Sequence, residues 1–205
     1  MASESMTVHC FDVLVKYFHQ EHDVDTSRFS DCKTSFPLFV TWSKRDRIDG
    51  WSLRGCIGTF SALRLEHGLR KFSLSSALRD KRFSSMRREE IPDLRCDVSL
   101  LTDFEVAKHH YDWTIGVHGI QIDFQGRHDR YSGTYLPQVA VDQGWTKDET
   151  LISLIRKAGF SGRLSDVMKT LQVTRYRSSK HSLTFDEYVE LRAMDGINVC
   201  ALICG

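Results

Sequence analysis

The sequence predicts an α+β protein, with an antiparallel sheet flanked by helices in one compact unit. Short segments of alternating apolar residues, typical of strands, follow one another across turns as hairpins, and segments with helical spacing lie before and after them. Strands joined as hairpins favour this class over a doubly wound parallel sheet, which needs a helix between successive strands. The length of 205 residues, with 41% hydrophobic and 27% charged residues, fits an ordinary globular domain.

The first half of the chain is predicted to contain two helices and a hairpin. Apolar residues recur at helical spacing from about Thr7 to His19, and the polar stretch 21–34 favours a loop. The apolar segments 36–42 and 51–60, separated by a charged turn, predict two paired strands. One face of a second helix is lined by Leu65, Leu69, Phe72 and Ser76.

Three further strands are expected near the middle of the chain. Cys96, Val98 and Leu100 alternate with polar residues, which predicts a strand. A second alternating segment, 120–124, is followed by a polar turn and by the segment 131–135, which together predict another hairpin.

The last third of the chain is predicted to be helical. Pro137 suits the first position of a helix and Gly144 suits its end. Thr146 and Glu149 have the spacing of a capping box ahead of a helix that Gly159 ends. A second capping box with a hydrophobic staple is predicted from Thr184, Glu187, Leu183 and Tyr188.

Charge and composition argue against several classes of function. A net charge of +1 and a pI near 7.7 provide no overall attraction to nucleic acid or to a membrane. The N-terminus lacks the pattern of a signal peptide, and no apolar run reaches the roughly 20 residues that span a bilayer. We therefore expect a cytoplasmic or nuclear location, with the six cysteines reduced. Because nucleotide-binding motifs and zinc-ligand spacings are absent, neither a cofactor nor a metal is expected.

The segment Leu53–Gly58, with the sequence Leu-Arg-Gly-Cys-Ile-Gly, is the candidate functional centre. On a regular strand Leu53 and Ile57 would share the core face, and Arg54 and Cys56 the other. The two glycines remove side chains, and a glycine inside a strand often marks a bulge or a close backbone approach.

This arrangement suggests a nucleophilic cysteine as one hypothesis. A cation such as Arg54 would favour the thiolate form of Cys56, and His118 could act as general base if folding brings it close. Asp80 and Arg82 could hold a substrate or orient that base. The simpler interpretation is a buried cysteine that behaves as a small hydrophobic residue, with Arg54 paired to a carboxylate.

At this segment the chain resembles the AMMECR family, whose signature is the Leu-Arg-Gly-Cys-Ile-Gly stretch. The resemblance extends from about Met6 to Ala193. It is carried by further segments in the same order along the chain: 76–83, 98–102, 118–120, 135–137, 144–145 and 157–160.

The resemblance implies a domain over residues 6–194, followed by a tail at 195–205. It also implies two unequal subdomains, of which the larger holds an antiparallel sheet with helices. The family resemblance implies no established activity. The association of some prokaryotic relatives with Memo-like proteins and radical S-adenosylmethionine enzymes suggests redox or modification chemistry by analogy only.

Three functional hypotheses remain open from the sequence. In the first, the chain is an interaction or regulatory protein, and its central motif lines a recognition groove for an unidentified protein or small molecule. In the second, the chain is an enzyme that uses Cys56 as a thiolate, with Arg54 and His118. In the third, which is less favoured, basic residues between Arg79 and Arg88 bind nucleic acid. The expected groove residues are Leu53, Gly55, Ile57, Gly58, Asp80 and Arg82.

Overall fold

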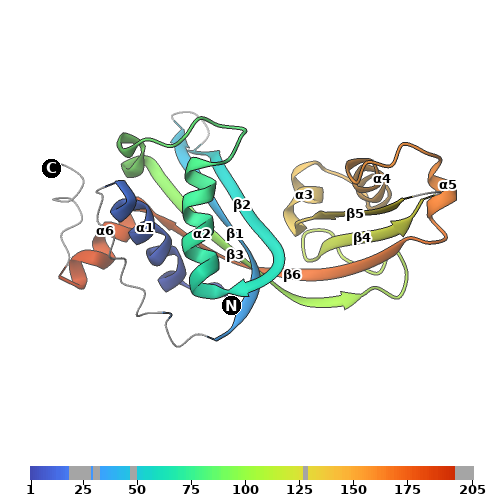
Figure 1. The fold of residues 1–205 in the computed structure, drawn as a ribbon, viewed down its shortest axis with the longest axis horizontal. Helices are drawn as coiled ribbons and strands as arrows, with labels where there is room; N and C mark the ends of the chain where they lie inside the picture. The colour runs from blue at the N-terminus through green and yellow to red at the C-terminus, as the bar shows by residue number, and fades with distance from the viewer. Residues whose placement is uncertain (19–28, 30–32, 47–49, 127–128, 197–205) are drawn as a thin grey trace. The chain divides into compact units, whose positions relative to one another are not determined.

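The computed structural model describes residues 1–18, 29, 33–46, 50–126 and 129–196. The chain divides into two compact units. The first unit comprises Met1–Leu100 together with Ser179–Gly205, and the second comprises Leu101–Ser178. Two unequal units, each containing strands and helices, agree with the predicted α+β class (Figure 1).

The sheet of the first unit is built around the central strand β1, Ser35–Asp46. β1 pairs antiparallel with β2, Gly50–Arg64, and with β3, Leu94–Val106. The strand order is β2-β1-β3-β6-β4-β5, so β2 is an edge strand of the described sheet. The predicted hairpin of the first half and the predicted strand after it are therefore confirmed, and each strand extends beyond its predicted limits.

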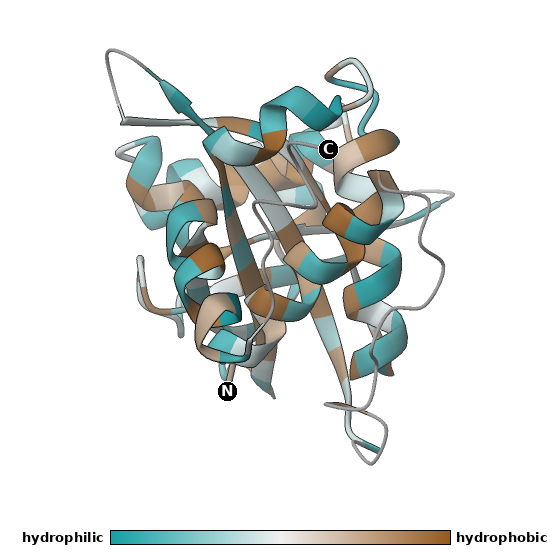
Figure 2. Ribbon diagram, turned by 90° about the vertical axis from the view of Figure 1, so that its left-hand side faces the viewer, coloured by the Kyte–Doolittle hydropathy of each residue, from teal (hydrophilic) through white to brown (hydrophobic). Residues whose placement is uncertain are grey.

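One face of this sheet is covered by helices α1, Glu4–Phe18, and α2, Leu65–Leu78. The predicted first helix is confirmed and begins three residues earlier than expected, while residue 19 lies outside the described part. The 3-10 helix η2, Arg88–Asp93, and helix α6, Phe185–Met194, complete the unit. Polar and apolar residues alternate along the helical ribbons in Figure 2. The buried core shared by these elements includes Phe11, Leu14, Leu38, Val40, Trp42, Leu69, Val98 and Leu183.

A buried polar contact links α1 with α6. Arg192 Nε donates to Asp12 Oδ1 at 2.9 Å, and Tyr188 Oη donates to the same oxygen at 2.8 Å. Asp12 and Arg192 are 4% and 6% exposed, so each charge is compensated inside the protein. The contact joins the two sequence segments that form the first unit.

The second unit contains a hairpin of β4, Gly119–Gln125, and β5, Arg130–Tyr135. β4 also pairs antiparallel with β6, Gln172–Thr184. The short helices of this unit are α3, Pro137–Asp142; α4, Lys147–Lys157; and α5, Leu164–Val167. The core lies mainly between the strands and α4 and includes Trp113, Ile120, Ile122, Phe124, Leu151, Leu154, Ile155 and Val173.

The helix signals read from the sequence are confirmed. Thr146 and Thr184 each accept a hydrogen bond from the backbone N–H of the glutamate three residues later, and each glutamate side chain accepts from the threonine N–H. Gly144 and Gly159 have φ values of +64° and +95°, the left-handed conformation that suits glycine after a helix.

Two expectations need correction. The last third is not only helical, because the 13-residue strand β6 lies between α5 and α6. Leu53 does not face the core, since its exposed fraction is 44%. Most of the predicted loop 21–34, and residues 197–205 of the predicted tail, lie outside the described residues.

Candidate functional site

A β-bulge in β2 changes the direction of the motif side chains. Trp42 of β1 is paired with Gly55 and the next residue, Ser43, is paired with Leu53, so Arg54 is an additional residue in β2. The extra residue reverses the alternation of faces on one side of it. Leu53 is therefore turned to the side of Ser43, whereas Ile57 still packs against the core.

The bulged residue Arg54 makes a buried, two-pronged ion pair with Glu90 of η2. Its Nε and Nη2 atoms donate to Oε2 and Oε1 at 2.9 and 3.0 Å. This hydrogen bonding, opposed by burial, lowers the pKa of Glu90 to about 2. Arg87 N–H also donates to Glu90, at 2.9 Å. Arg54 thus fixes the motif strand to the 3-10 helix, as the simpler interpretation of this arginine anticipated.

Gly55 is required by a close approach between β2 and α2. A Cβ atom built on Gly55 would overlap the carbonyl oxygen of Ser76, which belongs to the helix backbone. A Cβ on Gly58 would similarly collide with the backbone of Leu38 and the ring of Phe39. Both glycines of the motif therefore have packing roles. Of the two interpretations given above for a glycine inside a strand, a bulge or a close backbone approach, the close approach is the one found at both positions.

Asp80 and Arg82 bind the backbone of Cys56 from the loop after α2. Asp80 Oδ2 accepts from Cys56 N–H at 2.9 Å, and Arg82 Nη2 donates to the Cys56 carbonyl at 3.3 Å. Arg82 also pairs with Asp80 at 2.7 Å. Hydrogen bonding from Arg82 is the largest cause that holds the pKa of Asp80 far below its ordinary value. Asp80 and Arg82 therefore lie beside Arg54 at the motif. Asp80 and Arg82 bind the motif backbone, and Arg54 binds a carboxylate.

The thiol of Cys56 is half-buried on the face of the sheet opposite α1 and α2. Thr41 of the central strand β1 is paired with Cys56 of β2 on one side and with Asp97 of β3 on the other. The three side chains therefore form a row across the sheet. Thr41 Oγ1 donates to Cys56 Sγ at 3.1 Å. Burial raises the pKa of the Cys56 thiol, and the hydrogen bond from Thr41 and the charge of Arg82 only partly oppose it.

We call this surface, defined by Thr41, Leu53, Cys56 and Asp97, the motif face. Asp97 is 4% exposed, and its Oδ2 atom pairs with Lys180 Nζ at 3.0 Å. Its Oδ1 atom is buried without a hydrogen bond from the described residues and lies 3.5 Å from Arg95 Nε. The motif face therefore combines an exposed leucine with a thiol and a buried carboxylate.

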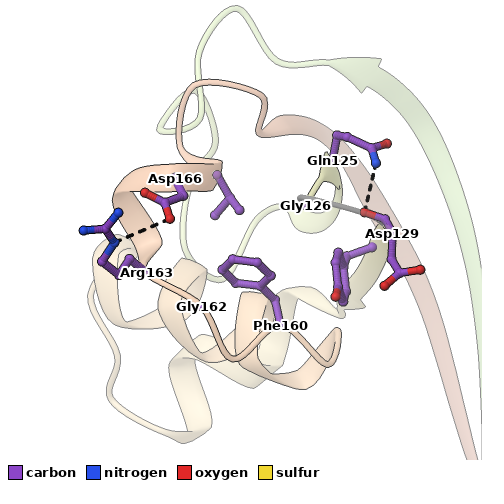
Figure 3. A pocket seen from close by; sticks show the side chains of 9 residues that line it. Gln125, Gly126, Asp129, Phe160, Gly162, Arg163 and Asp166 are labelled. Atoms are coloured by element: carbon purple, nitrogen blue, oxygen red, sulfur yellow. Dashed lines mark hydrogen bonds and ion pairs between the residues drawn. The ribbon is translucent and has the colours of Figure 1, made fainter.

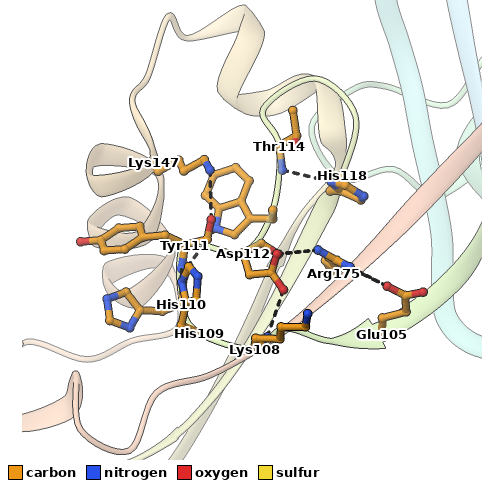
Figure 4. A network of polar contacts seen from close by, with 11 residues as sticks. Glu105, Lys108, His109, His110, Tyr111, Asp112, Thr114, His118, Lys147 and Arg175 are labelled. Atoms are coloured by element: carbon orange, nitrogen blue, oxygen red, sulfur yellow. Dashed lines mark hydrogen bonds and ion pairs between the residues drawn. The ribbon is translucent and has the colours of Figure 1, made fainter.

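His118 belongs to the second unit, whereas Cys56 belongs to the first. The Thr114 N–H donates to His118 Nδ1 at 3.0 Å, which assigns the proton of the neutral ring to Nε2 (Figure 4). Partial burial and the charges of Arg175 and Arg177 lower the pKa of His118. The approach of His118 to Cys56 stays a prediction, because the histidine contacts described here are made within the second unit.

The surroundings of His118 form a polar cavity of about 430 Å³. Arg175 is held by Glu105 at 2.8 Å and by Asp112 at 2.8 Å, as Figure 4 shows. The lining residues are Asp103, Glu105, His118, Arg175 and Arg177. Two arginines and two carboxylates leave this cavity without a net charge.

The other polar residues considered in the sequence provide less support for a functional site. Of the basic residues predicted between Arg79 and Arg88, Arg82 is engaged by Asp80. Within the described part of the chain, no group of three or more histidine, cysteine or acidic residues could hold a metal ion. His109 Nδ1 accepts from the N–H of Tyr111 instead. Helices that are long and apolar enough to cross a membrane are absent from the described residues.

Sequence reasoning missed Glu90, Thr41 and Asp97 as parts of the site. Glu90 lies 36 residues after Arg54, and the charged stretch around it contains several carboxylates. Thr41 could have been found, because the predicted hairpin places it on the strand next to the motif. Asp97 follows the predicted strand residue Cys96, so the sequence could indicate which face of that strand it occupies. Its neighbours Thr41 and Lys180 on other strands could not be predicted.

The fold and the site define a two-unit α+β protein in which a bulged edge strand carries a glycine-rich cysteine motif. The chain belongs to the AMMECR1 family, whose model matches residues 7–181. It is 42% identical over 200 residues to an uncharacterized protein of Arabidopsis thaliana, covering 96% of this chain and 92% of the relative. It is 38% identical over 189 residues to an uncharacterized protein of Schizosaccharomyces pombe, covering 92% and 96%.

A solved structure has the same fold. The crystal structure of an uncharacterized protein from Pyrococcus horikoshii aligns with a TM-score of 0.71 at 24% identity. The alignment covers 87% of this chain and 90% of that chain. At this level of identity the likeness extends to the fold alone, and all three of these proteins are described as uncharacterized.

Proposed function

We propose that the chain is an interaction or regulatory protein that binds a partner protein through its motif face. The observation that carries this proposal is the exposure of Leu53. An apolar side chain with an exposed fraction of 44% lies in the family motif, and the bulge at Arg54 directs it away from the core. A large apolar side chain held at the surface of a rigid element is a typical anchor in a protein interface.

The contacts around the motif support presentation of a fixed surface. The side chains of Arg54, Asp80 and Arg82 each bind another part of the first unit, so the backbone of the motif is held at several points. A surface that is already ordered loses less conformational entropy when it binds. On this proposal the charged residues of the motif act through the shape of β2.

The environment of Cys56 favours recognition over nucleophilic catalysis. A nucleophilic cysteine needs a thiolate, but burial raises the pKa of this thiol. Arg54, the cation expected to stabilise the thiolate, is paired with Glu90. Nucleic-acid binding is also less supported, since Arg82 is engaged by Asp80 and the chain has a net charge of only +1.

The proposal is tested by removing the exposed anchor. Tagged wild-type protein and the Leu53→Asp variant are purified from the native cells, and their bound proteins are quantified by mass spectrometry. Ile152→Asp is the matched control, because Ile152 has an exposed fraction of 43% and lies on α4 in the second unit. We expect proteins enriched by the wild type and by Ile152→Asp to be lost from Leu53→Asp.

Two results would contradict the proposal. The first is recovery of the same proteins by Leu53→Asp and the wild type, provided that circular dichroism and thermal unfolding show both to be folded. The second is an equal loss from Ile152→Asp, which would indicate a nonspecific effect of a surface charge. A partner identified in this way should slow iodoacetamide labelling of Cys56 when both purified proteins are mixed.

A further inference from the structure

The second unit contains an aromatic cavity that is separate from the residues discussed so far. Its volume is about 500 Å³, within the range of small-ligand sites. Figure 3 shows Phe160 between the side chains of Asp166 and Asp129. The cavity is lined by Gln125, Gly126, Asp129, Tyr131, Phe160, Gly162, Arg163, Asp166 and Val167.

Two aromatic rings form perpendicular walls of this cavity. The rings of Tyr131 and Phe160 have centroids 5.4 Å apart and an interplanar angle of 79°. Both contact Phe124, which is 3% exposed; Tyr131 stacks on it at 5.3 Å and Phe160 meets it edge-on at 5.6 Å. The walls are therefore supported from the core of the unit.

The backbone around the cavity is shaped to hold these rings. A Cβ on Gly162 would lie 2.5 Å from the ring of Phe160, and a Cβ on Gly126 would lie 2.7 Å from the ring of Tyr131. Arg156 Nη1 donates to the carbonyls of Phe160 and Gly162 at 2.9 and 3.0 Å, which fixes the loop after α4. Glycine at these positions thus lets the Phe160 ring lie close to the backbone at Gly162, and the Tyr131 ring close to the backbone at Gly126.

The charges at the cavity favour a cation. Its described lining residues include two acidic residues, Asp129 and Asp166, and one cation, Arg163, which pairs with Asp166 at 3.5 Å. The carbonyl of Asp129 accepts from Gly126 N–H at 2.8 Å and from Gln125 Nε2 at 3.2 Å, which holds Asp129 beside Tyr131. The described lining residues thus carry a charge of −1, which disfavours phosphate and other anions.

The shape of the walls narrows the class of cation. A flat nucleobase stacks between parallel rings, whereas the rings here are perpendicular. A methylated ammonium has an apolar, rounded surface and a diffuse positive charge, which aromatic faces attract. An unmethylated ammonium is more strongly hydrated and gains less from such walls. We propose that this cavity is a binding site for a methylated ammonium group, with Tyr131 and Phe160 as walls and Asp129 and Asp166 as counter-charges.

The test uses the full chain labelled with ¹⁵N and followed by NMR. The amide signals of Gly126 and Gly162 report on the cavity, and those of Gly144 and Gly196, which do not line it, are references. The probes are choline, its neutral isostere 3,3-dimethylbutan-1-ol, and a short peptide with either trimethyl-lysine or lysine. We expect choline and the methylated peptide to shift the two cavity signals, with at least about fivefold weaker binding of the neutral isostere and the lysine peptide.

The probes also distinguish the two sources of the ligand. Equal affinity for choline and for the methylated peptide would assign the site to a free quaternary ammonium compound. Binding of the methylated peptide about tenfold tighter than choline would assign it to a methylated protein. The proposal would be overturned if the neutral isostere bound as well as choline, or if no probe shifted the cavity signals at about 10 mM.

Variants provide an independent check. Asp166→Asn should weaken choline binding about threefold or more, because the lining loses one of its two counter-charges. Asp142→Asn is the matched control; Asp142 is an exposed residue of α3 outside the cavity lining. Equal choline affinity in both variants would contradict the role of Asp166. Phe160→Leu should abolish binding, and the Asp166 comparison remains decisive if that variant fails to fold.

Discussion

Replacing Glu90 by glutamine should destabilise the protein in a pH-dependent way. The pKa of Glu90 is about 2 in the folded protein, compared with an ordinary value of 4.5. At about 1.4 kcal/mol for each pKa unit, this difference corresponds to about 3 kcal/mol of the free energy of unfolding. The side chains of Glu90 and Arg54 are each only 11% exposed, so solvent screens their ion pair weakly.

The sign of the pH dependence follows from the lowered pKa. A carboxyl with a lowered folded-state pKa contributes its full stability above its unfolded pKa, near 4.5, and loses it as the pH falls towards about 2. At about pH 7 we therefore expect Glu90→Gln to be about 3 kcal/mol less stable than the wild type. The difference should shrink progressively below about pH 5.

Urea unfolding followed by tryptophan fluorescence at several pH values measures this difference. Trp42 is fully buried in the core of the first unit, so unfolding of that unit changes the emission, to which Trp113 in the core of the second unit also contributes. The matched control is Glu89→Gln, which makes the same chemical change at an exposed neighbour and should cost less than about 0.5 kcal/mol. The reasoning would be refuted if Glu90→Gln and the wild type differed by a constant amount from about pH 7 to about pH 3.

Three further predictions concern the motif and the helix starts. Gly55→Ala should lower the free energy of unfolding by about 3 kcal/mol or more, because the new Cβ overlaps the backbone of Ser76; an unchanged thermal midpoint would contradict this. Iodoacetamide labelling of Cys56, followed by peptide mass spectrometry, should have a pH midpoint above about 8.5, since burial raises the pKa of the thiol; a lower midpoint would restore the thiolate hypothesis. Thr184→Ala should cost about 1 kcal/mol in urea unfolding through loss of the cap on Glu187 N–H, and no measurable cost would show that the cap is dispensable.

Most regular elements could be predicted because their signals are local. The capping boxes that begin α4 and α6 depend on residues three positions apart, and the hairpins depend on alternation within single segments. β6 was missed because its buried residues, Val173, Tyr176 and Leu183, do not follow one alternating pattern, and polar residues occupy much of the strand. A single periodicity is the usual signal for a strand, and this one lacks it.

The arrangement of the motif residues could be predicted only in part from the sequence. The glycines correctly indicated close backbone approach, but the position of the bulge depends on the pairing of β2 with β1. A shift of one residue in that pairing moves Leu53 from the core to the surface. The partner of Arg54 was likewise beyond sequence reasoning, because Glu90 reaches it from an element 36 residues away.

The division of the first unit into two sequence segments has a consequence for how the protein folds. The second unit is one continuous stretch, 101–178, and can fold as soon as that stretch has been synthesised. The first unit must wait for α6, because Asp12 of α1 finds its buried partner in Arg192, 180 residues later. Until α6 has been synthesised, the carboxylate of Asp12 lacks its buried partner, and the apolar residues of α1 lack their contacts with α6. A chain shortened before α6 should therefore leave the first unit incomplete and prone to aggregation while the second unit still forms.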